Sequence, residues 1–162
     1  MKQNFDVKKD RLRYTKNSSS ATLAYLAILF NVLYFVSVYS YNEHSGRFYY
    51  NMTIGFSVVA NLLFLLISFL ASEGVKNYKL GYCIAFIPLG AFQLLRIVGI
   101  PMSAHDHTII LDDEMTQVMN DAQFYYVCAC LCLSALACFA VAFTGIRKTI
   151  ILREYEKSLI EQ

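Results

Sequence analysis

Four long stretches without charged residues dominate the hydrophobic pattern of this chain, and each is apolar around most of the circumference that a helix would present. A surface helix of a soluble protein has a single apolar stripe instead. A helix needs about 20 residues to cross the hydrocarbon core of a bilayer. The pattern therefore predicts four transmembrane helices, at about residues 20–41, 49–71, 80–100 and 122–145.

Length and composition support a membrane protein with one domain. The chain has 162 residues, of which 57% are hydrophobic and 16% are charged, against about 25% charged in a typical soluble domain. We expect an all-α polytopic protein in which the four helices form a bundle. In the expected order, a basic tail (1–19) precedes the transmembrane domain (20–145), which contains an outer loop (101–121), and an amphipathic tail (146–162) ends the chain.

The first apolar stretch follows a basic segment, so a cleaved signal peptide is the alternative to a membrane helix. The apolar run is too long for a signal core, and no small-x-small cleavage site follows it, since the sequence there is Val38-Tyr39-Ser40-Tyr41. This favours a membrane helix.

The distribution of Lys and Arg predicts the orientation. Short cytoplasmic loops carry an excess of these residues. Only Arg47 and Arg96 are expected on one side of the membrane. The other basic residues are expected on the opposite side: Lys2, Lys8, Lys9, Arg11, Arg13, Lys16, Lys76, Lys79, Arg147, Lys148, Arg153 and Lys157. We expect both termini in the cytoplasm and the protein in the cell membrane. The net charge of +2, divided between tails and one loop, indicates no nucleic-acid partner.

Two asparagines lie near the middle of the first two spans. In an antiparallel pair Asn31 and Asn61 would be at similar depth. An amide facing lipid is unfavourable, and a hydrogen bond between helices is the usual remedy. The two side chains are therefore expected to bond to each other, with contact to a substrate or a partner helix as the alternative.

The third span carries the other polar candidates. Gln93 and Arg96 are three residues apart and share a face, and Pro88 predicts a kink before them. Arg96 would lie about 6 Å from the outer end of the span and could extend its guanidinium to the interface or pair with a loop. The alternative is that Arg96 binds an anionic ligand or a carboxylate of a partner.

Small residues recur every fourth position in the last span, at Cys130, Ser134, Cys138 and Ala142. Such a stripe lets another backbone approach closely, and the approaching helix could belong to this chain or to another subunit. The run from Cys128 through Cys130 to Cys132 resembles a metal or redox motif. Residues two apart on a helix point in nearly opposite directions, so a structural role is favoured.

The outer loop contains His105 and His107 among several acidic residues. This spacing is not diagnostic of a metal site, and a solvated acidic loop is the default expectation. Met115, Val118, Met119 and Ala122 follow helical spacing, which predicts that the fourth helix begins outside the membrane.

The C-terminal tail continues the helical periodicity with an apolar face formed by Leu152, Tyr155 and Leu159 among charged residues. An amphipathic helix of this kind lies on the membrane or docks a partner.

Function has to be inferred from these few groups, because no motif in the chain specifies a reaction. No predicted span contains Asp or Glu, and ion-coupled transporters usually keep a carboxylate in the membrane. We expect no enzyme activity, no cofactor and no bound metal. The leading hypothesis is a non-enzymatic accessory or regulatory subunit whose partners are the bilayer and another membrane protein or further copies of itself. The alternative is a small oligomeric channel or carrier, its path lined by Asn31, Asn61, Gln93 and Arg96.

Overall fold

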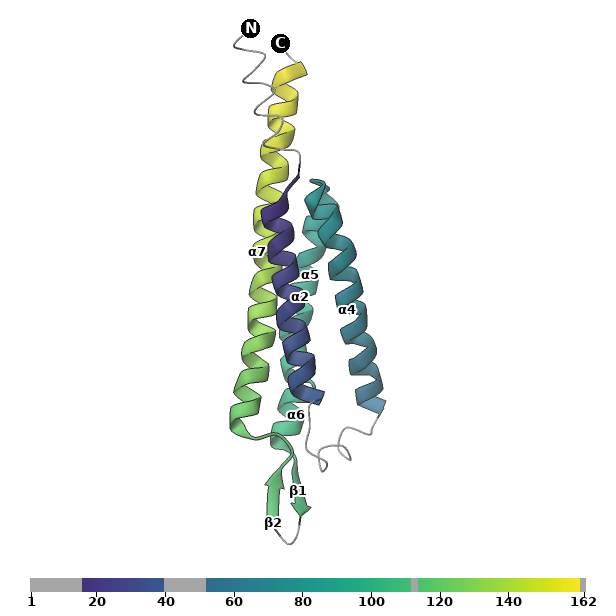
Figure 1. Ribbon diagram of the computed structural model, residues 1–162, viewed down its shortest axis with the longest axis vertical. Helices are drawn as coiled ribbons and strands as arrows, with labels where there is room; N and C mark the ends of the chain where they lie inside the picture. The colour runs from purple at the N-terminus through teal and green to yellow at the C-terminus, as the bar shows by residue number, and fades with distance from the viewer. Residues whose placement is uncertain (1–15, 40–51, 112–113, 161–162) are drawn as a thin grey trace.

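Four long helices make up most of the protein. The computed structural model describes residues 16–39, 52–111 and 114–160 (Figure 1). The long helices are α2 (Ser18–Tyr39), α4 (Met52–Lys76), α5 (Leu80–Val98) and α7 (Asp121–Ile160). All four contain windows long and apolar enough to cross a membrane, which indicates an integral membrane protein.

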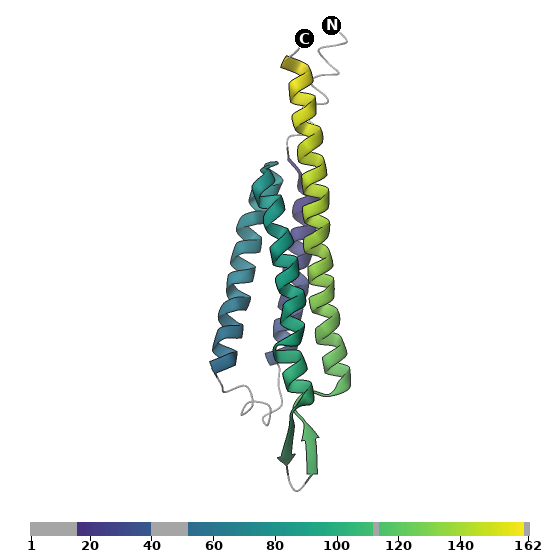
Figure 2. The same cartoon turned by 180° about the vertical axis from the view of Figure 1, so that it is seen from behind.

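The helices pack side by side. α7 lies against α2 and α5, and α4 lies against the other sides of the same two helices. Figures 1 and 2 show that the turn between α4 and α5 lies at one end of the molecule and a β-hairpin at the other. We call these the turn end and the hairpin end.

Leucines on α4 cover much of its outer surface. Leu62, Leu66 and Leu70 are 57%, 55% and 58% exposed, respectively. Single exposed apolar residues are ordinary on soluble proteins, but a whole helix face of them is what lipid requires.

Two apolar clusters fill the interior. The cluster at the turn end contains Ala24, Phe64, Val75, Phe86 and Val141. The cluster at the hairpin end contains Tyr34, Val38, Met119, Val127 and Leu131. The polar side chains described below lie between them.

The helices approach one another most closely at small residues. At Gly145 of α7, an added Cβ would lie 2.7 Å from Sγ of Cys83 on α5, a distance that real side chains do not adopt. At Gly90 of α5, an added Cβ would lie 3.0 Å from the ring of Phe139 on α7. Glycine at both positions therefore permits the close contact between α5 and α7.

The third span differs from the expected helix over residues 80–100. α5 runs through Pro88 without interruption and ends at Val98, and Gly99 separates it from the short helix α6 (Ile100–Asp106). The helix is therefore broken at Gly99, because the backbone of this residue (φ −75°, ψ −115°) lies outside the helical region.

The prediction of helix before residue 121 is wrong. β1 (Thr108–Leu111) pairs antiparallel with β2 (Glu114–Gln117), with Thr108 opposite Gln117. Val118 and Met119 are buried against the hairpin-end cluster, whereas Met115 is 78% exposed, so these residues share no helix face. The helical spacing therefore arose without a helix, because Val118 and Met119 are buried in the hairpin-end cluster and Met115 belongs to β2.

Asn120 sets the start of α7. Its side-chain Oδ1 accepts a hydrogen bond from the Gln123 N–H at 2.8 Å, and its backbone oxygen accepts one from the Phe124 N–H. This N-cap satisfies donors that have no partner within a helix, so the helix begins at Asp121.

Candidate functional site

A group of polar side chains is buried between the two apolar clusters. We call Asn31, Asn61, Gln93, Arg96 and Ser134 the polar cluster; they come from α2, α4, α5 and α7, so every long helix contributes. Four of them are at most 1% exposed, and Arg96 is 9% exposed. Polar groups buried to this degree require hydrogen-bond partners.

The asparagines supply the link between α2 and α4. Asn31 Nδ2 donates to Asn61 Oδ1 at 2.9 Å, which confirms the contact expected from their depth. Asn31 Oδ1 also accepts hydrogen bonds from Gln93 Nε2 at 2.9 Å and from Arg96 Nη1 at 2.7 Å. Asn31 therefore ties α2 to both α4 and α5.

Arg96 turns inward, so the expectation that its guanidinium reaches the membrane interface is wrong. Its Nη1 also donates to Gln93 Oε1 at 2.8 Å, and its Nη2 donates to Asn61 Oδ1 at 3.0 Å. The guanidinium carbon lies 4.5 Å from the centroid of the Tyr34 ring, a cation–π contact. Amide oxygens from three helices thus accept hydrogen bonds from the guanidinium inside the protein.

Ser134 joins α7 to the cluster. Its Oγ accepts a hydrogen bond from Gln93 Nε2 and donates one to the backbone oxygen of Ala27, both at 2.9 Å. The other members of the small-residue stripe, Cys130, Cys138 and Ala142, are at most 4% exposed. The stripe is thus covered by helices of this chain, and it is not a free surface for another subunit.

The chemistry of the cluster is that of a cross-link. Its groups are amides, a hydroxyl and a guanidinium, and the Ser134 hydroxyl hydrogen is already bonded to a carbonyl. Hydrogen bonds of this kind hold helices together in a membrane, where the helices gain little from leaving an equally apolar solvent.

A cavity of about 340 Å³ borders the cluster. Its walls come from α2, α4, α5 and the start of α6, and the lining residues are Tyr34, Phe56, Ser57, Ala60, Phe92, Leu95, Arg96, Gly99 and Ile100. The cavity is mainly apolar, and Arg96 is the one charged side chain among the described residues that line it. Sequence reasoning missed it, because a cavity depends on how four helices are rotated against one another.

The remaining candidates do not converge on the polar cluster. Nε2 of His105 on α6 lies 3.0 Å from Oδ1 of Asp121 on α7, and its Nδ1 lies 3.6 Å from Oδ1 of Asp106. His105 therefore connects α6 and α7 at the hairpin end. Among the described residues, no three His, Cys, Asp or Glu side chains are grouped as metal ligands would be. His107 is exposed and Cys132 faces outward, away from buried Cys130.

The predicted docking tail is part of α7, which is helical to Ile160. Leu152 and Tyr155 are partly buried, and the side chain of Leu159 lies outside the described part of the structure.

Comparisons of the chain with protein-family models, with curated proteins and with solved structures find no match.

The asparagine contact gives a direct test of the cluster. Asn61→Leu should destabilise the folded helices by about 1 kcal/mol, and Asn31→Leu by more, because Asn31 also accepts two hydrogen bonds from α5. The double variant should lose less than the sum of the two. Unfolding of the purified chain in mixed micelles, followed by circular dichroism, measures these losses. Additive losses would contradict the contact.

Proposed function

We propose that this chain is a non-enzymatic accessory or regulatory subunit of a larger complex in the cell membrane. In this proposal the four helices form a bundle, both ends of the chain are cytoplasmic, and the C-terminal part of α7 docks a partner protein.

The length of α7 carries the proposal. It contains 40 residues, and at 1.5 Å per residue a helix of that length spans about 60 Å, twice the hydrocarbon thickness of roughly 30 Å. Figures 1 and 2 show its last turns extending beyond α2, α4 and α5 at the turn end. The apolar face of a helix that projects beyond its own bundle is available to a groove on a partner protein.

That projecting part is amphipathic. Leu152 and Tyr155 lie on one side, whereas Arg153, Glu154 and Lys157 are exposed. Partner grooves commonly bind a helix with this pattern. The internal hydrogen bonds of the polar cluster also favour a subunit, since side chains that line an aqueous path keep polar atoms directed toward water.

The alternative is a channel or carrier, and the cavity beside Arg96 is the observation that favours it. In that case Asn31, Asn61, Gln93 and Arg96 would exchange some of their mutual hydrogen bonds for bonds to a solute during transport.

The function is tested with tail variants. The full chain extracted in mild detergent should copurify with one membrane protein at fixed stoichiometry. Truncation after Arg153, and the double variant Leu152→Ser/Tyr155→Ser, should abolish that association. The double variant should keep its helix content, and the truncated chain should lose only the helical residues that are removed. The matched control Arg153→Ala/Lys157→Ala, which alters exposed polar residues of the same segment, should retain it.

Reconstitution of the purified chain into liposomes tests the alternative. We expect no solute flux. Flux that is lost in Arg96→Ala or Gln93→Ala and is unaffected by truncation after Arg153 would overturn the subunit proposal.

The orientation requires its own experiment. In a background without native thiols, single cysteines replace two exposed residues, Met115 in the hairpin and Ser158 in α7. From the distribution of Lys and Arg, a membrane-impermeant thiol reagent added to intact cells should label Met115→Cys and leave Ser158→Cys unlabelled. The reverse pattern would place both termini outside.

A further inference from the structure

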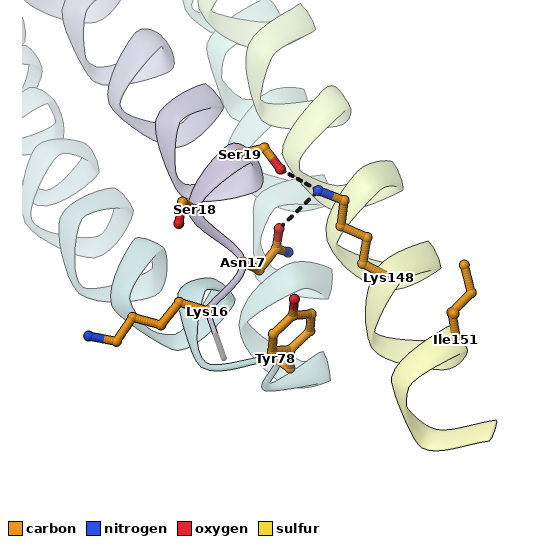
Figure 3. Close-up of a pocket in the computed structure, with 7 residues that line it drawn as sticks. All are labelled: Lys16, Asn17, Ser18, Ser19, Tyr78, Lys148 and Ile151. Carbon is orange, nitrogen blue, oxygen red and sulfur yellow. Dashed lines mark hydrogen bonds between the residues drawn. The ribbon is translucent and has the colours of Figure 1, made fainter. Parts of the chain in front are cut away.

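A second cavity, of about 560 Å³, lies at the turn end of the molecule. Three segments that are distant in sequence form it, as Figure 3 shows: the start of α2, the turn before α5 and the cytoplasm-proximal part of α7 in the proposed orientation. Its lining residues are Lys16, Asn17, Ser18, Ser19, Tyr78, Lys148 and Ile151.

The electrostatics of this cavity favour an anion. Lys148 Nζ donates to Ser19 Oγ and lies 3.3 Å from Asn17 Oδ1. Lys16 also lines the cavity, but Figure 3 shows its ammonium group directed away from Lys148. None of the lining residues in the described part of the chain is acidic. With no carboxylate among the described lining residues, the Lys148 ammonium group gives the cavity a positive potential.

The start of α2 adds backbone donors. Ala21 donates the first helical hydrogen bond, to the backbone oxygen of Asn17, so the N–H groups of Ser18 and Ser19 precede the helical ladder. α2 has 22 residues, and the N-terminus of such a helix carries a partial positive charge. Phosphate groups commonly bind at this position of a helix.

The Asn17 side chain supplies an independent observation. It is 1% exposed, and no residue in the described part of the structure accepts a hydrogen bond from its Nδ2. Its Oδ1 already accepts hydrogen bonds from the Ser20 N–H and from Lys148, which fixes the orientation of the amide. Figure 3 shows this amide between Lys148 and Tyr78, in the wall of the cavity. A buried donor without an acceptor is rare and points to a missing partner.

We propose that this cavity binds a phosphate group, carried by an anionic phospholipid or present as free phosphate. Phosphate oxygens would accept hydrogen bonds from Asn17 Nδ2, from the serine N–H groups and from Lys148. The cavity opens where the membrane-spanning part of α2 begins, at Ser18, which is the level of lipid headgroups. Its volume exceeds that of a phosphate ion, so a glycerol or sugar headgroup also fits.

Two variants test the site. Asn17→Asp keeps the oxygen that caps α2, and it replaces the unpartnered donor with an acceptor that repels phosphate. Lys148→Met removes the ammonium group and keeps a long apolar side chain. The matched control is Lys157→Met, which removes a lysine from the same helix far from the cavity.

The binding experiment uses the detergent-purified full chain and three probes: dioctanoyl phosphatidic acid, zwitterionic dioctanoyl phosphatidylcholine and inorganic phosphate. Native mass spectrometry measures lipid binding, and calorimetry measures phosphate binding. We expect phosphatidic acid to bind more tightly than phosphatidylcholine, and both site variants to weaken its binding by about tenfold or more, because each removes or reverses a charge-assisted hydrogen bond. Lys157→Met should bind like the unchanged chain.

The probes also separate the two sources of the phosphate group. Tight binding of phosphatidic acid with weak binding of inorganic phosphate indicates a lipid headgroup, and the reverse indicates the free ion. Either result supports the proposed site if Asn17→Asp and Lys148→Met both weaken binding of the preferred probe. No preference for an anionic probe, or a preference that neither Asn17→Asp nor Lys148→Met reduces, would overturn the proposal.

Discussion

Ser134→Leu is expected to destabilise the folded protein by about 2–4 kcal/mol, combining the cost of overpacking with the loss of two buried hydrogen bonds. Ser134 Oγ lies 2.9 Å from the backbone oxygen of Ala27, so α2 and α7 have no room for a larger side chain there. Leucine would also leave Gln93 Nε2 with one acceptor fewer. The measurement is the free energy of unfolding in mixed micelles.

Two further variants separate bulk from hydrogen bonding. Ser134→Ala removes the hydroxyl without adding volume, and it should cost about 1 kcal/mol. Cys132→Leu adds similar bulk on the same helix at an exposed position, and it should have little effect. If Ser134→Leu were no worse than Cys132→Leu, α2 and α7 would not be in contact at this level.

These expectations differ from those that the sequence alone supports. The every-fourth-residue stripe through Ser134 identified a packing face, but its partner could have been another subunit. In the structure α2 and α5 cover the stripe. Ser134→Leu is therefore expected to impair folding of this chain and not its assembly with another subunit. Disruption of an outside partner is now expected only from changes in the tail.

The spans themselves could be predicted well from the sequence, because length and apolar character depend on neighbouring residues alone. α2 covers Ser18–Tyr39 where residues 20–41 were expected, and α5 begins at Leu80 as expected. α4 continues to Lys76, beyond the expected residue 71, because the helix runs on through polar residues at its end.

The direction of individual side chains could not be predicted in the same way. A helix that is apolar around its whole circumference has no polar face to indicate its rotation. The depth of Asn31 and Asn61 was enough to predict their contact, since two amides in a membrane have few other partners. Arg96 had two satisfactory directions, outward to the interface and inward to the amides, and spacing along α5 does not distinguish them.

Arg96→Leu distinguishes the three roles considered for this arginine. If the side chain cross-links the helices, its loss removes hydrogen bonds to Asn31, Gln93 and Asn61 and should destabilise the fold by about 2–3 kcal/mol. A guanidinium that extended to the interface would make its replacement nearly neutral. A guanidinium reserved for a ligand would abolish flux or binding without a loss of stability.

The size of the loss depends on what remains after the change. Replacing an entire buried polar group with apolar residues is often neutral, whereas removing one partner leaves the others without hydrogen bonds. In Arg96→Leu the amide oxygen of Gln93 loses its Arg96 donor. The amide oxygens of Asn31 and Asn61 each lose one of their two hydrogen-bond donors. Adding Gln93→Leu should therefore cost less than the same change in the unaltered chain.

Arg96→Lys completes the series. Lysine keeps the charge but cannot place two nitrogens against amide oxygens on different helices, as the planar guanidinium does. Its free energy of unfolding should fall between those of the unchanged chain and Arg96→Leu, and the cation–π contact with Tyr34 should weaken with it. Equal stability of all three chains would rule out the cross-link. Loss of flux or binding in Arg96→Leu would then identify a ligand-binding residue beside the 340 Å³ cavity, and unchanged flux and binding would indicate an arginine at the interface.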